Sequence, residues 1–355
     1  MKQFIPLRKR PVQILFISFC IIFILMPMTP STPVYSSSDT LNITLVGDLF
    51  LGNWIEKYIQ KDPSYPYLHI ASILEQSDLL IGNLEAPLSL KGEVYVAKTY
   101  TLHCHPQTVQ VLKAGGFDAV TLANNHIMDF GPSALMETIA VLTEHNIKYA
   151  GTGADIKQAR TPAYLEKCGF KIALLAYNNT LPLEFNASDS TPGTAPGRWE
   201  YIETDIKKAK AAADIVIVSF HWSAELLKEP KPYQRSLARL SIDSGADLVF
   251  GHHPHVIQGI EIYKNRVIAY SLGNFIFSSY SKKVKDSIIL QVRMTKDGPQ
   301  AVTIFPINVN NHQVVFRPKP LSGADATVAL EELSALSSKF GTKIEIHEDK
   351  GEIIF

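Results

Sequence analysis

The sequence contains little cysteine and no excess of charge of either sign. Three of its 355 residues are cysteine, and after the first forty residues only Cys104 and Cys168 remain. Two thiols in a chain of this length do not make a disulfide framework, and no cysteine cluster indicates structural zinc. Lysine plus arginine equals aspartate plus glutamate, at 34 each. Because a neutral chain has no overall field that attracts polyanions, we expect no nucleic-acid partner.

The apolar run near the N-terminus is too short to span a bilayer comfortably. It extends from Ile14 to Met26, ends at Pro27 and follows the basic residues Lys2, Arg8, Lys9 and Arg10. This order is typical of an export signal, whereas a membrane-spanning helix needs about 20 apolar residues. Residues 1–39 are therefore either a cleaved signal peptide or an N-terminal membrane anchor with a short linker. We expect the rest of the chain at the extracytoplasmic face of the cell membrane, or secreted if the signal is cleaved.

From Asn42 onward, short β-branched runs alternate with longer amphipathic stretches, which is the pattern of an α/β domain. The predicted strands are residues 43–46, 79–81, 119–122, 172–176, 215–219, 248–250 and 267–270. Helices are predicted over 131–145 and 233–244, and a loop long enough to cover a site over 178–199. Further strands follow over 287–315, then a helix over 324–339 and a strand pair at 344–346 and 353–354. We assign residues 40–320 to one domain and residues 321–355 to a C-terminal helix and strand extension.

Five of the predicted strands end directly in polar clusters. These clusters are Gly47-Asp48, Gly82-Asn83-Leu84-Glu85, Asn124-Asn125-His126, His221-Trp222 and Gly251-His252-His253-Pro254-His255. In α/β sheets the ligand crevice lies at the carboxyl ends of the strands, so one fold can bring all five together. Carboxylate, amide and imidazole groups are ligands of divalent metals such as zinc, manganese and iron. Each cluster alone also fits a turn, a helix cap or a buried core histidine, and their shared placement favours a metal site.

The order of these motifs resembles the capsule-synthesis CapA family of poly-γ-glutamate biosynthesis. The resemblance covers about residues 42–278 and includes three further motifs: Asp129 with Gly131, Gly245-Ala246-Asp247, and Tyr270-Ser271-Leu272-Gly273-Asn274-Phe275. It implies an α/β (α+β) fold of the calcineurin-like metallophosphoesterase type, a sandwich of two mixed β-sheets flanked by helices. It also implies two divalent metal ions, manganese, zinc or iron.

The wider phosphoesterase pattern assigns roles to individual residues. As metal ligands it implies Asp48, Asn125, His221, His253 and His255. His126 would be the proton donor or charge stabiliser, and Asp129 is placed to orient it.

The chain departs from that pattern at two positions. Phe50 stands where the pattern has a histidine ligand, and Asn83 stands where it has a metal-bridging aspartate, with Glu85 close by as a substitute. Asn83 and Glu85 therefore join the predicted ligand set. If Phe50 faces the site, Phe50→His should tighten binding of one metal.

Two functions are compatible with these residues. The first is a metal-dependent hydrolase of capsule biosynthesis or export, acting on an amide, a phosphodiester or a lipid-linked intermediate. The second is a non-catalytic metal-binding assembly or polymer-binding subunit, with poly-γ-glutamate and capsule synthase subunits as partners. The chain has no glycine-rich phosphate loop of the Walker type, and this absence, with the export signal, disfavours a cytoplasmic nucleotide phosphatase.

Overall fold

The structure is a computed structural model that describes Met1 and residues 39–355. The predicted export segment lies almost entirely outside these residues, so its fate stays a prediction. Within the described residues, no helix combines the length and apolarity that a bilayer crossing requires. Residues 39–355 belong to one compact unit, and within it the C-terminal segment pairs with the first sheet.

The first sheet is mixed and has ten strands, of which eight follow the order β17-β18-β15-β14-β1-β2-β3-β4. From β1 to β4 the neighbouring strands are parallel, whereas β14 and β15 are antiparallel to their neighbours. In addition, β13 pairs with β1, and β16 pairs with β15. The bounds are β1 Leu41–Phe50, β2 Leu79–Leu84, β3 Ala119–Thr121, β4 Lys148–Ala150, β13 Asn274–Phe277, β14 Asp286–Thr295, β15 Gly298–Asn308, β16 Lys319–Pro320, β17 Glu345–His347 and β18 Lys350–Ile354.

The second sheet is also mixed and has six strands in the order β11-β12-β10-β9-β7-β6. Its central strands β12, β10, β9 and β7 are parallel, and the edge strands β11 and β6 are antiparallel to their neighbours. A separate two-stranded sheet joins β5 and β8. The bounds are β5 Thr152–Gly153, β6 Ala163–Lys167, β7 Phe170–Asn178, β8 Gly193–Thr194, β9 Ile215–His221, β10 Leu248–His252, β11 Ile260–Tyr263 and β12 Arg266–Ala269.

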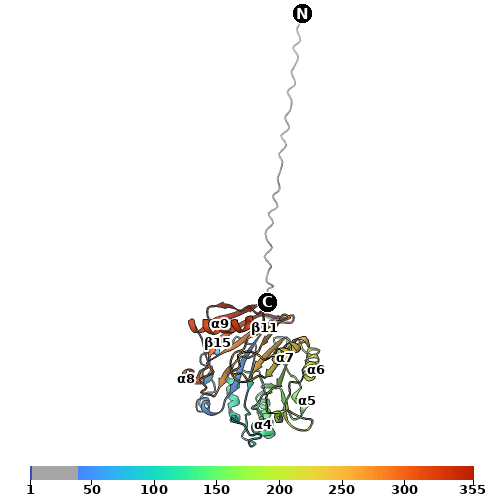
Figure 1. Ribbon diagram of the computed structural model, residues 1–355, viewed down its shortest axis with the longest axis vertical. Helices are drawn as coiled ribbons and strands as arrows, with labels where there is room; N and C mark the ends of the chain where they lie inside the picture. Colours follow the sequence, from blue (N-terminus) through green and yellow to red (C-terminus); the bar gives the residue numbers. More distant parts are fainter. Residues whose placement is uncertain (2–38) are drawn as a thin grey trace. The chain divides into compact units, whose positions relative to one another are not determined.

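Helices cover the outer faces of both sheets (Figure 1). The first sheet packs its outer face against α1 Glu56–Ile59, α2 Ala71–Leu74, α3 Val109–Ala114 and α4 Gly131–Glu144. The second sheet packs against α6 Trp199–Lys210 and α7 Pro232–Asp243. The remaining α-helices in the described residues are α5 Ile156–Ala159, α8 Asn311–Val314 and α9 Ala324–Ser338.

Alternation along the strands explains the layered core. In β7, Ile172 and Leu174 face the core between the two sheets, while Ala173 and Leu175 face the helices outside. Both faces are buried because helices cover a parallel sheet, so the strands read as nearly continuous apolar runs. Burial of each such leucine or isoleucine contributes about 1.5–3 kcal/mol. The predicted class, a sandwich of two mixed sheets flanked by helices, is confirmed.

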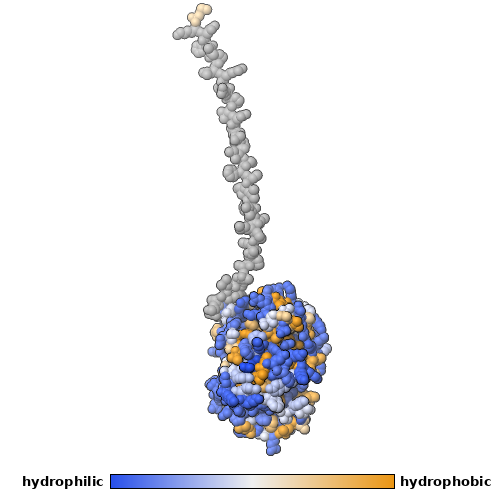
Figure 2. Space-filling view, turned by 90° about the vertical axis from the view of Figure 1, so that its left-hand side faces the viewer, coloured by the Kyte–Doolittle hydropathy of each residue, from blue (hydrophilic) through white to orange (hydrophobic). Residues whose placement is uncertain are grey.

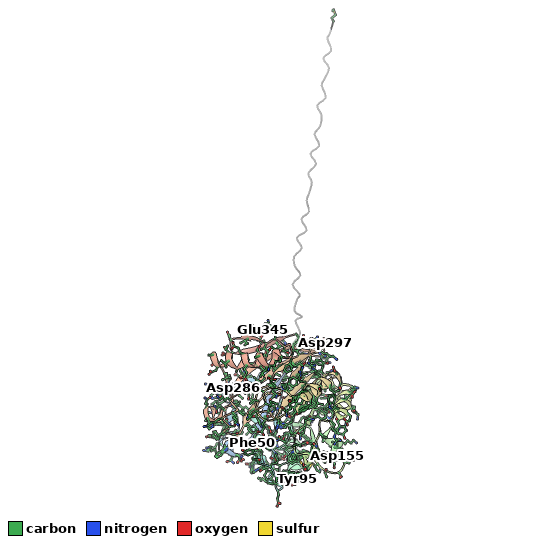
Figure 3. All side chains as sticks on the ribbon, in the orientation of Figure 1. Phe50, Tyr95, Asp155, Asp286, Asp297 and Glu345 are labelled. Atoms are coloured by element: carbon green, nitrogen blue, oxygen red, sulfur yellow. The ribbon has the colours of Figure 1, made fainter. Side chains whose placement is uncertain are left out.

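The surface mixes hydrophilic residues with separate apolar groups (Figure 2). Strands β1, β2 and β3 share one direction in the first sheet, and β7, β9 and β10 share one direction in the second. The contact of Glu85, which follows β2, with His221, at the end of β9, brings the two sets of carboxyl ends together. In Figure 3, Tyr95, which lies in a loop after β2, is at the opposite end of the fold from Asp297 and Glu345. The polar clusters of the sequence lie at these carboxyl ends.

Candidate metal centre

A close backbone contact positions Asp48 near the end of β1. The backbone nitrogen of Asp48 donates a hydrogen bond to the carbonyl of Gly273 at 3.1 Å. A Cβ at Gly47 would lie 1.9 Å from that same carbonyl oxygen, so only glycine fits there. The contact brings Asn274, at the start of β13, beside the carboxylate-bearing end of β1.

The turn after β10 holds two histidines in an uncommon backbone conformation. His253 has φ 91° and His255 has φ 58°, both in the region that favours glycine. Such residues cost on the order of 1–3 kcal/mol and persist only where the surrounding structure holds them. Their rings lie with centroids 6.1 Å apart, and the His221 ring from β9 lies 4.8 Å from that of His253. The backbone strain therefore coincides with a convergence of imidazoles.

Two groups of potential ligands overlap at one residue. Glu85, His221 and His253 form the first group, and Asp48, Glu85 and His255 form the second. Within each group, one ligand atom from each residue lies within 4.8 Å of the others. Oε1 of Glu85 is 3.5 Å from Nε2 of His221 and 3.9 Å from Nε2 of His255. Glu85 is thus placed where a bridging carboxylate of a dinuclear centre would stand.

The surroundings of Glu85 fit a bound cation. Among the described residues, neither carboxylate oxygen of Glu85 has a hydrogen-bond partner, although the side chain is fully buried. Nδ1 of His253 is likewise buried without a partner. Burial, together with the nearby charge of Asp48, raises the pKa of Glu85 well above its usual range. Buried polar atoms nearly always have a hydrogen-bond partner. These carboxylate oxygens and this imidazole nitrogen lack one, and both atom types are ligands of divalent metals.

Asp48 is held from several directions. Its Oδ1 accepts a hydrogen bond from Nδ2 of Asn83 at 2.9 Å, and its Oδ2 lies 3.3 Å from Nδ1 of His255. Nδ1 of His252 lies 2.8 Å from Oδ1. Burial alone would raise the pKa of Asp48, but His252 and His255 outweigh it and hold the pKa well below its usual range. Asp48 is therefore poised as a carboxylate.

The two predicted asparagine ligands also lie in the cluster. Oδ1 of Asn125 is 2.7 Å from Nε2 of His221. Asn83 turns its amide nitrogen toward Asp48, and its Oδ1 accepts hydrogen bonds from Thr121 at 3.3 Å and Asn124 at 3.1 Å. In this arrangement Asn83 orients Asp48, and its own role as a metal ligand stays a prediction.

His126 and Asp129 form a separate pair beside the ligand groups. Nδ1 of His126 is 2.6 Å from Oδ2 of Asp129, and the backbone nitrogen of Leu102 donates to the same oxygen at 2.7 Å. The pairing directs Nδ1 of His126 toward Asp129 and leaves Nε2 as its other hydrogen-bonding atom. Burial lowers the pKa of His126, and Asp129 acts against that shift.

Lys98 completes this group and was missed by reasoning from the sequence. Its Nζ lies 2.6 Å from Oδ1 of Asp129 and 3.1 Å from Nδ1 of His126, and it donates to the backbone carbonyl of Asn125. Lys98 lies in the loop between β2 and β3, where neither periodicity nor a strand end marks it. The His126, Lys98 and His255 side chains are 10 %, 16 % and 13 % exposed. Solvent therefore reaches the otherwise buried cluster beside these three residues.

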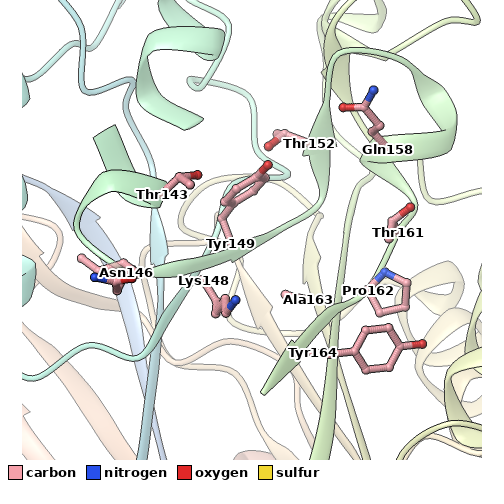
Figure 4. A pocket seen from close by; sticks show the side chains of 11 residues that line it. Thr143, Asn146, Lys148, Tyr149, Thr152, Gln158, Thr161, Pro162, Ala163 and Tyr164 are labelled. Carbon is pink, nitrogen blue, oxygen red and sulfur yellow. The ribbon is translucent and has the colours of Figure 1, made fainter. Parts of the chain in front are cut away.

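A cavity of about 550 Å³ lies elsewhere, between the edge strands β4 and β6 (Figure 4). Its lining is mixed polar and apolar and includes Thr143, Tyr149, Gln158 and Tyr164. None of its lining residues belongs to the candidate metal centre. The two features are therefore distinct.

Comparison with known proteins identifies the family. The family model described as "Bacterial capsule synthesis protein PGA_cap" matches residues 42–279. The PGA biosynthesis protein CapA of Bacillus subtilis is 33% identical over 349 residues, which cover 95% of this chain and 91% of that protein. The chain belongs to the bacterial capsule synthesis protein family.

Other family relatives carry related names. The capsule biosynthesis protein CapA of Bacillus anthracis is 31% identical over 90% of this chain and 80% of that protein. A probable polyglutamine synthesis accessory protein of Mycobacterium tuberculosis is 30% identical over 81% of this chain and 80% of that protein. The resemblance to the CapA family predicted from the motifs is confirmed.

Solved structures with a related arrangement include two nucleotidases. The NAD nucleotidase of Haemophilus influenzae has a TM-score of 0.43 and 14% identity over 84% of this chain and 63% of that chain. A 5'-nucleotidase precursor of Thermus thermophilus has a TM-score of 0.43 and 13% identity over 84% of this chain and 59% of that chain. This chain thus spans about three fifths of each nucleotidase.

Phe50, at one of the two departures from the phosphoesterase pattern, does not face the cluster. The β1 register is irregular between Asp48 and Phe50, and Phe50 is buried in the apolar core outside the first sheet. Its ring lies 5.5 Å from the ring of Phe277, and the ring of Phe277 also lies 4.9 Å from the ring of His255. Phe50 therefore packs against a neighbour of His255 and lies in the apolar core, not in the candidate metal centre.

Proposed function

We propose that this protein is an extracytoplasmic, metal-dependent hydrolase of poly-γ-glutamate capsule biosynthesis or export. The observation that carries the proposal is the position of Glu85 in both ligand groups. The His126–Asp129 pair lies near them, because Lys98, which contacts both residues of the pair, also donates to the carbonyl of Asn125. The names of the relatives support the capsule assignment. The same names favour capsule synthase subunits and the polymer as partners, with the membrane contacted through the N-terminal segment.

The residues divide into a binding set and a proton-handling set. Asp48, Glu85, His221, His253 and His255 would hold two divalent ions, with Asn83 and Asn125 beside them. When bound, two such ions would supply Lewis-acid chemistry, which polarises a substrate oxygen and lowers the pKa of bound water.

As an imidazolium, whose Nδ1–H donates to Asp129, His126 would give its Nε2 proton to the leaving group and become neutral. Asp129 holds the ring through Nδ1. Lys98 neutralises the charge of Asp129 and fixes the carbonyl of Asn125.

A second candidate is a metal-binding assembly subunit without turnover. Two observations favour it: Phe50 supplies no ligand, and the amide nitrogen of Asn83, which cannot bind a metal, faces Asp48. Such a subunit would keep the ions and lose the chemistry, because positioning a reactive group needs a complete ligand set.

Turnover separates the two candidates. The full-length protein, loaded with manganese or zinc, is assayed on bis-p-nitrophenyl phosphate and on poly-γ-glutamate, with His126→Ala as the matched control. Hydrolysis by the wild type that is lost in His126→Ala at equal metal content supports the enzyme. Metal binding without hydrolysis of either substrate favours the assembly subunit. Wild-type protein that binds no metal contradicts both.

The compartment has its own test. A reporter enzyme that is active only outside the membrane, fused after Phe355, should be active because the basic flank of the N-terminal segment stays in the cytoplasm. Activity of a cytoplasm-specific reporter alone would contradict the extracytoplasmic placement.

A further inference from the structure

Two loops that leave the carboxyl ends of site strands carry a group of exposed apolar side chains. We name this group the apolar rim and define it as Val94, Tyr95, Tyr100, Leu181 and Leu183. Val94, Tyr95 and Tyr100 follow β2, which ends beside Glu85, and Leu181 and Leu183 follow β7. Exposed apolar side chains on the loops around a site are candidates for a binding surface.

The two loops are joined to each other. The ring of Tyr95 stacks on buried Phe185 with centroids 6.2 Å apart, and Nζ of Lys98 lies 5.2 Å from the same ring. Phe185 belongs to the loop after β7, two residues beyond Leu183. One aromatic ring thus connects both halves of the apolar rim to Lys98.

The apolar rim is also joined to the candidate metal centre. The backbone nitrogen of Tyr95 donates to the carbonyl of Asp129 at 2.9 Å, and that of Asn179 donates to the carbonyl of His221 at 2.8 Å. The backbone that carries the exposed side chains is therefore hydrogen-bonded to residues of the centre itself. Figure 3 shows Tyr95 at the tip of the fold on this side, and Figure 2 shows exposed apolar groups at the same end.

The charge of the metal centre indicates which head group a ligand of the apolar rim would carry. Two divalent ions and Lys98 outweigh the carboxylates of Asp48, Glu85 and Asp129, so the loaded centre attracts an anion. An anion-binding centre beside exposed hydrocarbon fits a ligand with both characters. We propose that the apolar rim binds the hydrocarbon chain of an amphiphilic phosphate ester whose head group enters the metal centre. This proposal rests on the proposed function and names its substrate class.

Alkyl phosphates of increasing chain length test the proposal on the full-length, manganese-loaded protein. Methyl, butyl, hexyl and octyl phosphate are titrated calorimetrically below their micelle concentrations. A fully buried methylene raises affinity about fourfold, and one covered on one side about twofold. Octyl phosphate should therefore bind on the order of tenfold more tightly than butyl phosphate.

Serine substitutions on the rim should remove this chain-length dependence. In a Val94→Ser, Tyr100→Ser, Leu183→Ser variant, octyl phosphate should bind about as weakly as methyl phosphate, whose own affinity stays unchanged. These side chains are exposed, so the fold should tolerate their loss. Val328→Ser on α9 is the control, because Val328 is 65% exposed and Leu183 66%. It should leave the whole series unchanged.

The outcomes separate the two proposals. If methyl phosphate binds but octyl phosphate binds no better, the rim proposal is overturned and the metal centre stands. If no alkyl phosphate binds, the rim proposal is overturned, while bound metal and hydrolysis of poly-γ-glutamate still decide the proposed function. If affinity does not change with alkyl chain length but the protein binds phosphatidylglycerol vesicles through the apolar rim, the rim proposal is overturned in favour of a bilayer surface. If affinity does not change with chain length, and the wild type is a dimer whereas the triple serine variant is a monomer, the rim proposal is overturned in favour of a second copy of this chain.

Discussion

Oε1 of Glu85 lies 3.5 Å from Nε2 of His221, and both side chains are buried. Glu85 has no hydrogen-bond partner among the described residues. Its buried carboxyl group therefore lowers the free energy of unfolding of the metal-free protein and raises that of the metal-bound protein. Removal of this carboxyl group should therefore stabilise the metal-free protein and destabilise the metal-bound protein. These opposite effects distinguish a metal ligand from a buried acid that binds no metal.

Glu85→Leu should stabilise the metal-free protein and abolish tight metal binding. Loss of a buried, unpartnered polar group is expected to raise the free energy of unfolding by about 1–3 kcal/mol. In the presence of manganese the variant should lose the stabilisation that metal binding adds to the wild type. Chemical denaturation with and without metal, together with mass spectrometry of bound metal, measures both effects.

Glu261→Leu is the matched control. Glu261 is also buried, but it is paired with Arg239 at 2.5 Å and with the hydroxyl of Tyr270 at 2.6 Å. Its loss should lower the free energy of unfolding by about 1–3 kcal/mol and leave the bound metal unchanged. Equal metal content in wild type and Glu85→Leu would refute the bridging role.

Metal affinity should rise with pH because His255 must release a proton. Burial alone would lower its pKa, but the charge of Glu85 and the contacts with Asp48 raise the pKa of His255 to about 10 in the metal-free protein. This folded-state pKa exceeds the unfolded value near 6.5. The contacts of protonated His255 with Glu85 and Asp48 therefore give the folded state their full stabilisation below pH 6.5. That stabilisation is lost as pH rises toward 10.

Between pH 6.5 and 9, each proton released adds about tenfold in affinity per pH unit. Competition titrations with a chelator over that range measure the slope of the logarithm of metal affinity against pH. This slope should be smaller by about one in His255→Gln than in the wild type. His312→Gln serves as the control, because His312 bonds to the carbonyl of Tyr280 and is exposed. An identical slope in wild type and His255→Gln would show that His255 is not a ligand.

Replacement of His126 should separate chemistry from metal binding. His126 contacts Asp129 and Lys98 rather than the shared carboxylate, so His126→Ala should keep its metal. Turnover of bis-p-nitrophenyl phosphate should fall by about 10²–10⁴-fold. His253→Ala should instead lose metal and turnover together, because His253 belongs to a ligand group. Metal loss in His126→Ala comparable to that in His253→Ala would contradict this division.

Sequence reasoning predicted the strands and the meeting of their ends because both depend on local rules. A buried parallel strand needs apolar residues on both faces, and Ile215–His221 shows this pattern before it ends in a functional histidine. The carboxyl-end rule then places His221 beside Asp48 and Glu85, although 136 residues separate Glu85 from His221 in the chain.

The loop residues could not be predicted in the same way. Lys98 reaches Asp129 through a segment with neither strand nor α-helix between Leu84 and Val109, whose course depends on tertiary contacts such as Tyr95 with Phe185. The orientation of Asn83 depends on donors from Thr121 and Asn124, which only the folded sheet brings close. A residue type at a strand end indicates a candidate, and the hydrogen-bond network decides its role.

Phe50→His should fail to restore the ligand of the wider phosphoesterase pattern. Phe50 packs on Phe277 in an apolar core, and the irregular register after Asp48 removes it from the centre. The substitution leaves a buried imidazole without a partner and a poorly filled space, which should cost about 2–4 kcal/mol of stability. Phe50→Leu, which keeps the site apolar, should cost about 1.5 kcal/mol or less. Metal stoichiometry and affinity should equal those of the wild type in both variants. Tighter metal binding in Phe50→His alone would show that this position reaches the centre after all.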